Sequence, residues 1–190
     1  MRIGPVALLA TALAGGLAGR YTAPSTPAAA PTQAGSPRLE VGFSPKGNAE
    51  QVVLAVIESA SKTLRVSAYS FTSATVTKAL VAARKRGVDV QVVADDKNNA
   101  SSRYAKAAFG ALVAAGIPVR LNDAYAIHHD KFIIADQRNV ETGSFNYSAS
   151  AAERNSENAL AIWNAPDLAR TYDAHWRSRF DEGRPFAPDY

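Results

Sequence analysis

The sequence predicts an α/β fold in which a mixed β-sheet is flanked by helices on both faces. Short β-branched or alternating segments that suit strands are separated by segments with apolar residues at helical spacing. The chain has 190 residues, 47% of them hydrophobic and 20% charged, enough for one domain with its own core. We expect this domain to span residues 39–190.

In the first half of the domain, strands and helices alternate. Val52, Val53 and Val56 recur at helical spacing, and Gly87 and Gly116 mark the ends of two further helices. The expected strands are 39–43, 64–71, 88–94 and 117–121, and the expected helices are 49–61, 73–86 and one that ends near residue 115.

The second half of the domain is richer in short strands. We expect strands at 124–135, 140–145 and 160–163 and a terminal helix at 167–180. Residues 136–139 separate the first two of these strands as a turn, which makes them a tight hairpin centred between Gln137 and Arg138.

The amino-terminal residues differ from the domain in composition. Arg2 precedes an apolar run at 6–18 that is too short to span a bilayer, so residues 1–22 are expected to be a signal peptide that exports the protein to the periplasm or the medium. An apolar extension without a targeting role is the alternative. Residues 23–38 are rich in Pro and Ala and are expected to form a linker.

The residue types exclude several kinds of site. Cysteine is absent, which excludes disulfides, thiolate zinc sites, iron–sulfur clusters and cysteine nucleophiles. The formal net charge of +4 favours anionic partners such as nucleic acid, because a positive field concentrates polyanions near the surface.

Four polar side chains converge in the expected hairpin. On a strand, alternate side chains share a face, so His129 and Lys131 point together while His128 points the other way. The expected register places His129 opposite Asn146 and Lys131 opposite Ser144. This arrangement suits attack on a phosphodiester: His129 is the candidate nucleophile, and Lys131 and Asn146 donate hydrogen bonds where negative charge builds up. Such donors leave no need for a metal or another cofactor.

The spacing of these residues resembles a known family. The pattern His-x-Lys-(four residues)-Asp-(six residues)-Gly-Ser-x-Asn, the signature of the phospholipase D superfamily, is matched once, by His129, Lys131, Asp136, Gly143, Ser144 and Asn146. The segments 43–45, 68–71 and 154–158 also resemble the small bacterial endonucleases of that superfamily. The resemblance covers nearly all of the expected domain and implies a phospholipase D-like α/β/α sandwich.

The resemblance also implies roles for individual residues. His129 would form a covalent phosphohistidine, Lys131 and Asn146 would hold the phosphate, and Ser144 would support the site. Glu157 would orient a histidine, as carboxylates do elsewhere. Asp136 and Gly143 are expected to be structural, because the turn places Asp136 at the hairpin end, where it can bind turn amides.

The chemistry calls for a second histidine, which protonates the leaving oxygen. His128 faces the wrong way, and His175 lies in the expected terminal helix without a lysine motif beside it. We therefore expect a homodimer in which a twofold-related copy supplies the second His129.

Basic residues also surround the polar stretch that follows the strand at 88–94. Ligands usually bind at the carboxyl ends of strands in α/β sheets, so Lys97 and Arg103 are expected to contact substrate phosphates. A solvated loop and helix face without a ligand is the alternative.

The motif, the small size and the basic charge favour a nonspecific endonuclease that acts on DNA, with RNA as a second candidate substrate. The alternative is a lipid phosphodiesterase, because the same motif resembles phospholipases D and cardiolipin hydrolases. A catalytically silent nucleic-acid-binding module is a third class, which the intact His129, Lys131 and Asn146 argue against.

Overall fold

The computed structural model describes residues 35–188. The expected signal peptide and residues 23–34 of the expected linker lie outside the described residues. The strands are β1 (Arg38–Ser44), β2 (Thr63–Ala68), β3 (Asp89–Asp95), β4 (Val119–Asn122), β5 (Phe132–Ala135), β6 (Asn139–Gly143), β7 (Glu157–Trp163) and β8 (Arg184–Pro185). The helices are α1 (Ala49–Ser59), α2 (Ala74–Lys85), α3 (Asp96–Asn99), α4 (Arg103–Ala114), α5 (Ala149–Glu153) and α6 (Pro166–Glu182).

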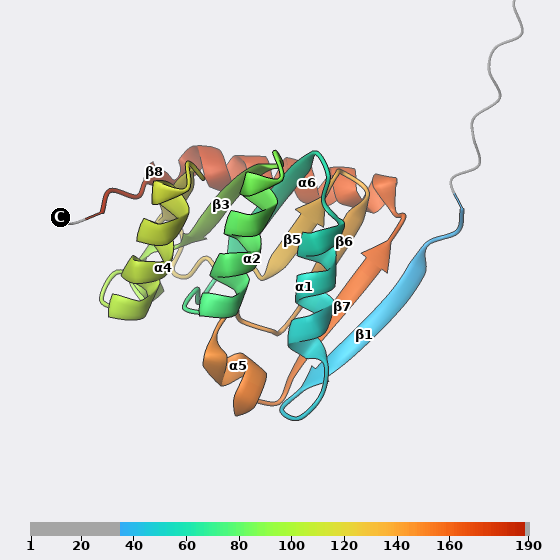
Figure 1. Cartoon of the computed structure of the whole chain (residues 1–190). Coiled ribbons are helices and arrows are strands. Elements are labelled where there is room, and N and C mark those ends of the chain that lie inside the picture. Colours follow the sequence, from blue (N-terminus) through green and yellow to red (C-terminus); the bar gives the residue numbers. More distant parts are fainter. Residues whose placement is uncertain (1–34, 189–190) are drawn as a thin grey trace, which may run out of the picture. The chain divides into compact units, whose positions relative to one another are not determined.

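The strands form one eight-stranded sheet in the order β1-β7-β6-β5-β2-β3-β4-β8. β2, β3 and β4 are parallel to one another, and every other neighbouring pair is antiparallel. Helices α1, α2 and α4 cover one face of the sheet, and α6 runs across the other face (Figure 1). The expected fold, a mixed sheet with helices on both faces, is confirmed.

Each face of the sheet has its own apolar core. The larger core lies under α1, α2 and α4. The smaller one consists of Val93, Phe132, Ile134, Val140, Ala169 and Trp176 under α6. Trp176 is 2% exposed, and its indole Nε1 donates to the carbonyl of Val66 at 2.9 Å, so it fixes α6 to the sheet as well as filling the core.

Local signals explain where the long helices begin and end. Ser73 accepts a hydrogen bond from the Val76 amide at the start of α2, and Ser102 does the same for Ala105 at the start of α4. Gly87 and Gly116, which follow these helices, have φ of 93° and 74°, the left-handed region that favours glycine.

The strand expected at 124–135 is wrong over most of its length, because β5 contains only its last four residues. Side chains bind the backbone of 124–131 in place of a neighbouring strand. The Asp95 carboxylate accepts from the His128 amide at 2.7 Å, and the Lys97 ammonium donates to the Tyr125 carbonyl at 2.9 Å. Backbone groups satisfied in this way have no need of a ladder partner.

The expected hairpin register is wrong by one residue. Ile134 pairs with Val140, and Ala135 pairs with Asn139, so three residues form the turn and it is centred on Gln137. Asp136 and Gln137 have φ of 55° and 51°, and the Arg138 amide donates to the Ala135 carbonyl. The short helices α3 and α5 and the edge strand β8 are further elements that the sequence analysis did not predict.

Within residues 35–188, no helix has the length and apolar character needed to cross a membrane.

A buried carboxyl group lies in β6 beneath the larger core. Glu141 is 0% exposed, its Oε2 accepts from the Tyr147 hydroxyl at 3.0 Å, and its Oε1 has no partner among the described residues. Burial raises the pKa of Glu141 to about 8, although the Tyr147 hydrogen bond opposes the rise. The carboxyl group is therefore neutral in the folded protein at pH 7.

We expect Glu141→Gln to reduce the loss of stability at rising pH. Between the ordinary pKa of 4.5 and about 8, the folded state holds a proton that the unfolded state releases, so wild-type stability falls as pH rises through this window. Thermal unfolding at pH 5, 6, 7 and 8 should show a Tm advantage of the variant that grows with pH, by roughly 2–4 °C per kcal/mol. The exposed Glu153→Gln is the control, and parallel Tm curves for wild type and Glu141→Gln would contradict the expectation.

Candidate active site

The motif residues gather at one end of the β5–β6 hairpin. His129 and Lys131 lie just before β5, while Ser144 and Asn146 follow β6. They therefore flank the hairpin in loops and do not share a strand face as expected. This end of the sheet is also the carboxyl end of the parallel strands β2 and β3, because β5 runs antiparallel to β2 and begins beside Ser67.

His129 and Lys131 share an aromatic neighbour that the sequence analysis did not single out as a site residue. The Tyr69 ring, just beyond β2, lies 4.5 Å from the His129 ring, centroid to centroid, in an edge-on arrangement. The Lys131 Nζ lies 4.9 Å from the centroid of the same ring and donates to the His129 carbonyl at 2.8 Å. His129 is exposed and Lys131 is 7% exposed, so the imidazole faces solvent above a buried ammonium group. Tyr69 could have been identified from its position, because it is an aromatic residue directly after the carboxyl end of β2.

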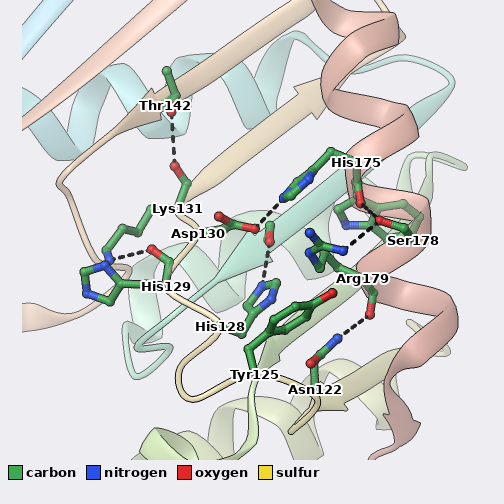
Figure 2. Close-up of polar contacts among 12 residues, drawn as sticks. Asn122, Tyr125, His128, His129, Asp130, Lys131, Thr142, His175, Ser178 and Arg179 are labelled. Carbon is green, nitrogen blue, oxygen red and sulfur yellow. Dashed lines mark hydrogen bonds and ion pairs between the residues drawn. The ribbon is translucent and has the colours of Figure 1, made fainter.

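Burial changes the proton affinity of two groups near the site. Desolvation lowers the pKa of Lys131, although the Glu157 and Asp130 carboxylates oppose that change. Burial also lowers the pKa of His128, which is 3% exposed and whose Nε2 lies 2.8 Å from the Ser67 hydroxyl. His128 is therefore an uncharged core residue, and it points away from the solvent that His129 faces (Figure 2).

Ser144 and Glu157 form a second polar pair beside the motif. The Ser144 hydroxyl donates to Glu157 Oε2 at 2.7 Å and accepts from the Asn158 amide at 3.0 Å. Glu157 Oε1 accepts from Asn155 at 2.9 Å, so both carboxylate oxygens are bound within the chain. The expected contact between Glu157 and a histidine is not among these bonds within residues 35–188. Asn146 lies nearby, with its Oδ1 3.4 Å from the Ser70 amide.

The two motif residues expected to be structural have clear packing contacts. Asp136 accepts hydrogen bonds from the amides of Ser61, Lys62 and Thr63 at 2.7–2.9 Å. Asp136 thus binds the amides at the start of β2. The expectation that it binds the turn amides of its own hairpin is not met by these bonds. Burial alone would raise the pKa of Asp136, but these hydrogen bonds outweigh it and lower the pKa. At Gly143, a Cβ atom would lie 2.2 Å from the Asn158 carbonyl oxygen, so only glycine lets β6 approach β7 here.

A groove of about 430 Å³ lies between the motif and α6. Its lining residues are His129, Asp130, Lys131, Phe132, Thr142, Gly143, Thr171, Tyr172 and His175. His175 lies in the terminal helix, away from the motif in sequence, yet α6 brings it to this groove, where its Nε2 is 2.8 Å from Asp130 Oδ2 (Figure 2). Within residues 35–188, no cluster of three or more His, Cys, Asp or Glu side chains is placed to hold a metal ion.

Lys97 and Arg103 do not line this groove. The Lys97 ammonium binds the Tyr125 carbonyl and also lies 3.5 Å from that of Ala126, so it supports the loop that leads to His129. The Arg103 guanidinium lies 4.8 Å from the centroid of the exposed Tyr104 ring and donates to the Tyr104 hydroxyl at 2.8 Å. Both residues remain exposed.

The family model described as "Cardiolipin synthase, PLD-like domain" matches residues 53–180, which include every motif residue. The chain belongs to the phospholipase D superfamily. Enzymes of the phospholipase D superfamily cleave phosphodiester bonds, and this is the activity class of the chain.

Three comparisons show where the chain lies within the superfamily. The crystal structure of Nuc, a phospholipase D family member from Salmonella typhimurium, is 47% identical, with a TM-score of 0.78 and coverage of 80% of this chain and 99% of that chain. A phospholipase D from Rickettsia bellii is 33% identical over 142 residues, 75% of this chain and 69% of the relative. A mitochondrial cardiolipin hydrolase from Danio rerio is 32% identical over 128 residues, 67% of this chain and 55% of the relative. The chain therefore lies in the Nuc-like branch of the superfamily.

We expect Tyr69→Leu to lower kcat for hydrolysis of bis(p-nitrophenyl) phosphate about ten-fold, with little change in KM. The ring that borders both His129 and Lys131 is lost, and about 1.4 kcal/mol lies within the range of such cation–ring contacts. Tyr69→Phe keeps the ring and should keep most of the activity in the same steady-state assay. Equal losses in the two variants would mean that the hydroxyl, and not the ring, matters.

Proposed function

We propose that this protein is a metal-independent, nonspecific endonuclease that cleaves DNA, with RNA as a second candidate substrate, through a covalent phosphohistidine on His129. The observation that carries the proposal is the exposed His129 imidazole beside the buried Lys131 ammonium at the edge of a groove. A nucleophile and a fixed positive charge together provide what attack on a phosphodiester anion requires.

The reaction proceeds in two displacements. In the first, a nitrogen of the neutral His129 imidazole attacks phosphorus, the bond to the leaving oxygen breaks, and a protonated second imidazole gives its proton to that oxygen. In the second, water attacks the phosphohistidine, the phosphorus–nitrogen bond breaks, and the second imidazole takes up the proton from water. Lys131 and the Asn146 amide stabilise the negative charge on the phosphoryl oxygens in both steps. Ser144 and Glu157, hydrogen-bonded to each other, support the site.

The second imidazole comes from a twofold-related copy of the chain. Of the three histidines, His128 is buried against Ser67, and His175 is bound to Asp130 on the far wall of the groove. A homodimer that brings two His129 side chains together supplies a nucleophile and a proton donor in line with it.

An exposed apolar surface beside the site supports this dimer. Leu39, Val41 and Phe43 are 65%, 50% and 60% exposed on the edge strand β1. Leu39 lies directly opposite Ile162, and Ile162 lies opposite Val140, a member of the core under α6. Opposite residues of antiparallel strands share a face, so Leu39 lies on the α6 face of the sheet. Val41 and Phe43, at alternate positions of the same strand, lie on that face too.

The apolar surface reaches the motif. Phe43 pairs with Asn158, whose amide donates to the Ser144 hydroxyl. Among residues 35–188, α6 packs mainly on β2 to β6, and the side chains of β1 stay exposed beside it. Exposed apolar patches of this kind mark protein interfaces, and a second copy seated here would border the site.

The choice of nucleic acid over lipid rests on two observations. The net charge is +4 for the whole chain and +2 without residues 1–22, and this positive balance favours a polyanion. The chain matches Nuc over 99% of that protein at 47% identity, in agreement with the resemblance to small bacterial endonucleases. The alternative is a phospholipase D-type lipid phosphodiesterase, which the names of the Rickettsia and Danio relatives favour. Export to the periplasm or the medium and substrate contacts by Lys97 and Arg103 remain part of the proposal.

We expect the purified protein to nick supercoiled plasmid in excess EDTA, and His129→Ala to reduce the rate at least about 1000-fold because the nucleophile is lost. Gel electrophoresis of the plasmid measures both. Nicking that EDTA abolishes would contradict the metal-independent mechanism. No nicking, together with hydrolysis of phosphatidylcholine or cardiolipin vesicles, would favour the lipid alternative.

We expect Val41→Asp to convert the dimer to a monomer and to abolish plasmid nicking, because a buried unpaired carboxylate at the interface costs several kcal/mol. Sedimentation velocity gives the oligomeric state, and circular dichroism checks that the variant folds. Gln51→Glu adds the same charge on α1, on the other face of the sheet, and should leave both properties unchanged. A fully active monomer would contradict the shared site.

A further inference from the structure

The groove beside His129 extends beyond the motif to α6. One wall holds His129 and Lys131, and the opposite wall holds Thr171 and His175, which are four residues apart in α6 and therefore share a helix face. Figure 2 shows the His175 ring on α6, directed toward the segment that carries His129 and Lys131. The two walls thus present polar groups to one space.

The groove is larger than the reacting group requires. A water molecule takes up about 30 Å³ in the liquid, so a phosphate group of five heavy atoms needs roughly 100–150 Å³. The groove measures about 430 Å³. After the reacting phosphate is seated on Lys131, space remains along α6 for a further part of the substrate.

The His175 imidazole is held with one nitrogen available. Its Nε2 is 2.8 Å from Asp130 Oδ2, and within residues 35–188 its Nδ1 has no hydrogen-bond partner. In the imidazolium form both nitrogens donate, so Asp130 fixes the ring while Nδ1 stays free to donate to a ligand. The side chain is 41% exposed, which leaves it accessible from the groove.

We propose that His175 forms a subsite for a second phosphate of a nucleic-acid strand, next to the phosphate that His129 attacks. The ring lies between the Asp130 carboxylate and this phosphate, and a proton on each ring nitrogen lets Nε2 donate to Asp130 and Nδ1 donate to the phosphate. Asp130 is a positioning residue that orients the imidazole. Thr171 borders the subsite, but its hydroxyl donates to the Asp167 carbonyl at 3.2 Å. This inference rests on the proposed nuclease function and deepens it. A strand that carries phosphates at regular intervals fills both positions, whereas a diester with a single phosphate fills one.

His175→Gln tests the subsite in the full-length protein. The glutamine amide can still donate to Asp130, but it carries no positive charge. With a fluorescently labelled single-stranded DNA, kcat/KM should fall about ten-fold, mainly through KM, and the slope of log KM against log salt should decrease by about 0.7, the value for one lost phosphate contact. With bis(p-nitrophenyl) phosphate, which has one phosphate, the loss should be at least five-fold smaller.

Arg170→Gln is the matched control, because it removes one positive charge from α6 outside the groove. It should leave both substrates and the salt slope unchanged.

Three outcomes would overturn the subsite. Equal losses on both substrates would mean that His175 only holds Asp130 and the segment beside it. An unchanged salt slope would mean that no phosphate contact is lost. A His175→Gln effect on cardiolipin vesicles and none on DNA would assign the second phosphate to a lipid. If wild-type protein hydrolyses bis(p-nitrophenyl) phosphate and does not cleave DNA, the nuclease proposal itself fails, whatever the variant does.

Discussion

The position of the segment that carries His128 and His129 depends on the buried carboxylate of Asp95 at the carboxyl end of β3. Asp95 is 1% exposed, and its two oxygens accept from the His128 amide at 2.7 Å and the Asn98 amide at 2.6 Å. A buried carboxylate is stable only when its oxygens are hydrogen-bonded, so these contacts hold both backbone segments at fixed places. His128 is then directed to Ser67, and His129 is left at the surface. A segment without strand pairing thus gains a defined conformation from one side chain of the neighbouring strand.

The two faces of the sheet differ in how completely helices cover them. Helices α1, α2 and α4 close a continuous core on one face. On the other face, α6 covers only part of the sheet, and the groove and the exposed side chains of β1 lie along its borders. The groove and the proposed dimer surface therefore lie on a single face. The cost is an edge strand with apolar side chains, which is a site of aggregation unless another chain covers it.

Local patterns predicted the parallel strands and the helix ends, because β-branched runs and glycines determine conformation within a few residues. The spacing of the motif predicted that His129, Lys131, Ser144 and Asn146 converge on one face of a hairpin; they do come together, but in the loops that flank its strands. The loop at 124–131 could not be predicted, since Asp95 and Lys97, which hold it, come from another part of the chain. The predicted register was wrong because the left-handed φ of Asp136 and Gln137, which accompanies the three-residue turn, does not follow from the residue types alone.

The same reason explains the neighbours that the sequence analysis missed. Tyr69 and His175 reach the motif only through the packing of β2 and α6, and neither belongs to a local pattern with it. The prediction for Asp136 was correct in part. Its structural contacts could be expected from its place in the turn, but its partners at 61–63 depend on how β2 lies beside the hairpin.

Gly143 changes how the Gly-Ser pair of the motif is understood. The Asn158 carbonyl, which leaves no room for a Cβ at residue 143, also accepts from the amides of Ser144 and Phe145 at 3.1 Å. A larger residue at 143 would push β7 away and separate Ser144 from Glu157, which begins that strand. The glycine and the serine are thus one geometric requirement and not two independent ones. In a descendant that no longer needs the Ser144–Glu157 contact, selection would be free to lose both residues together.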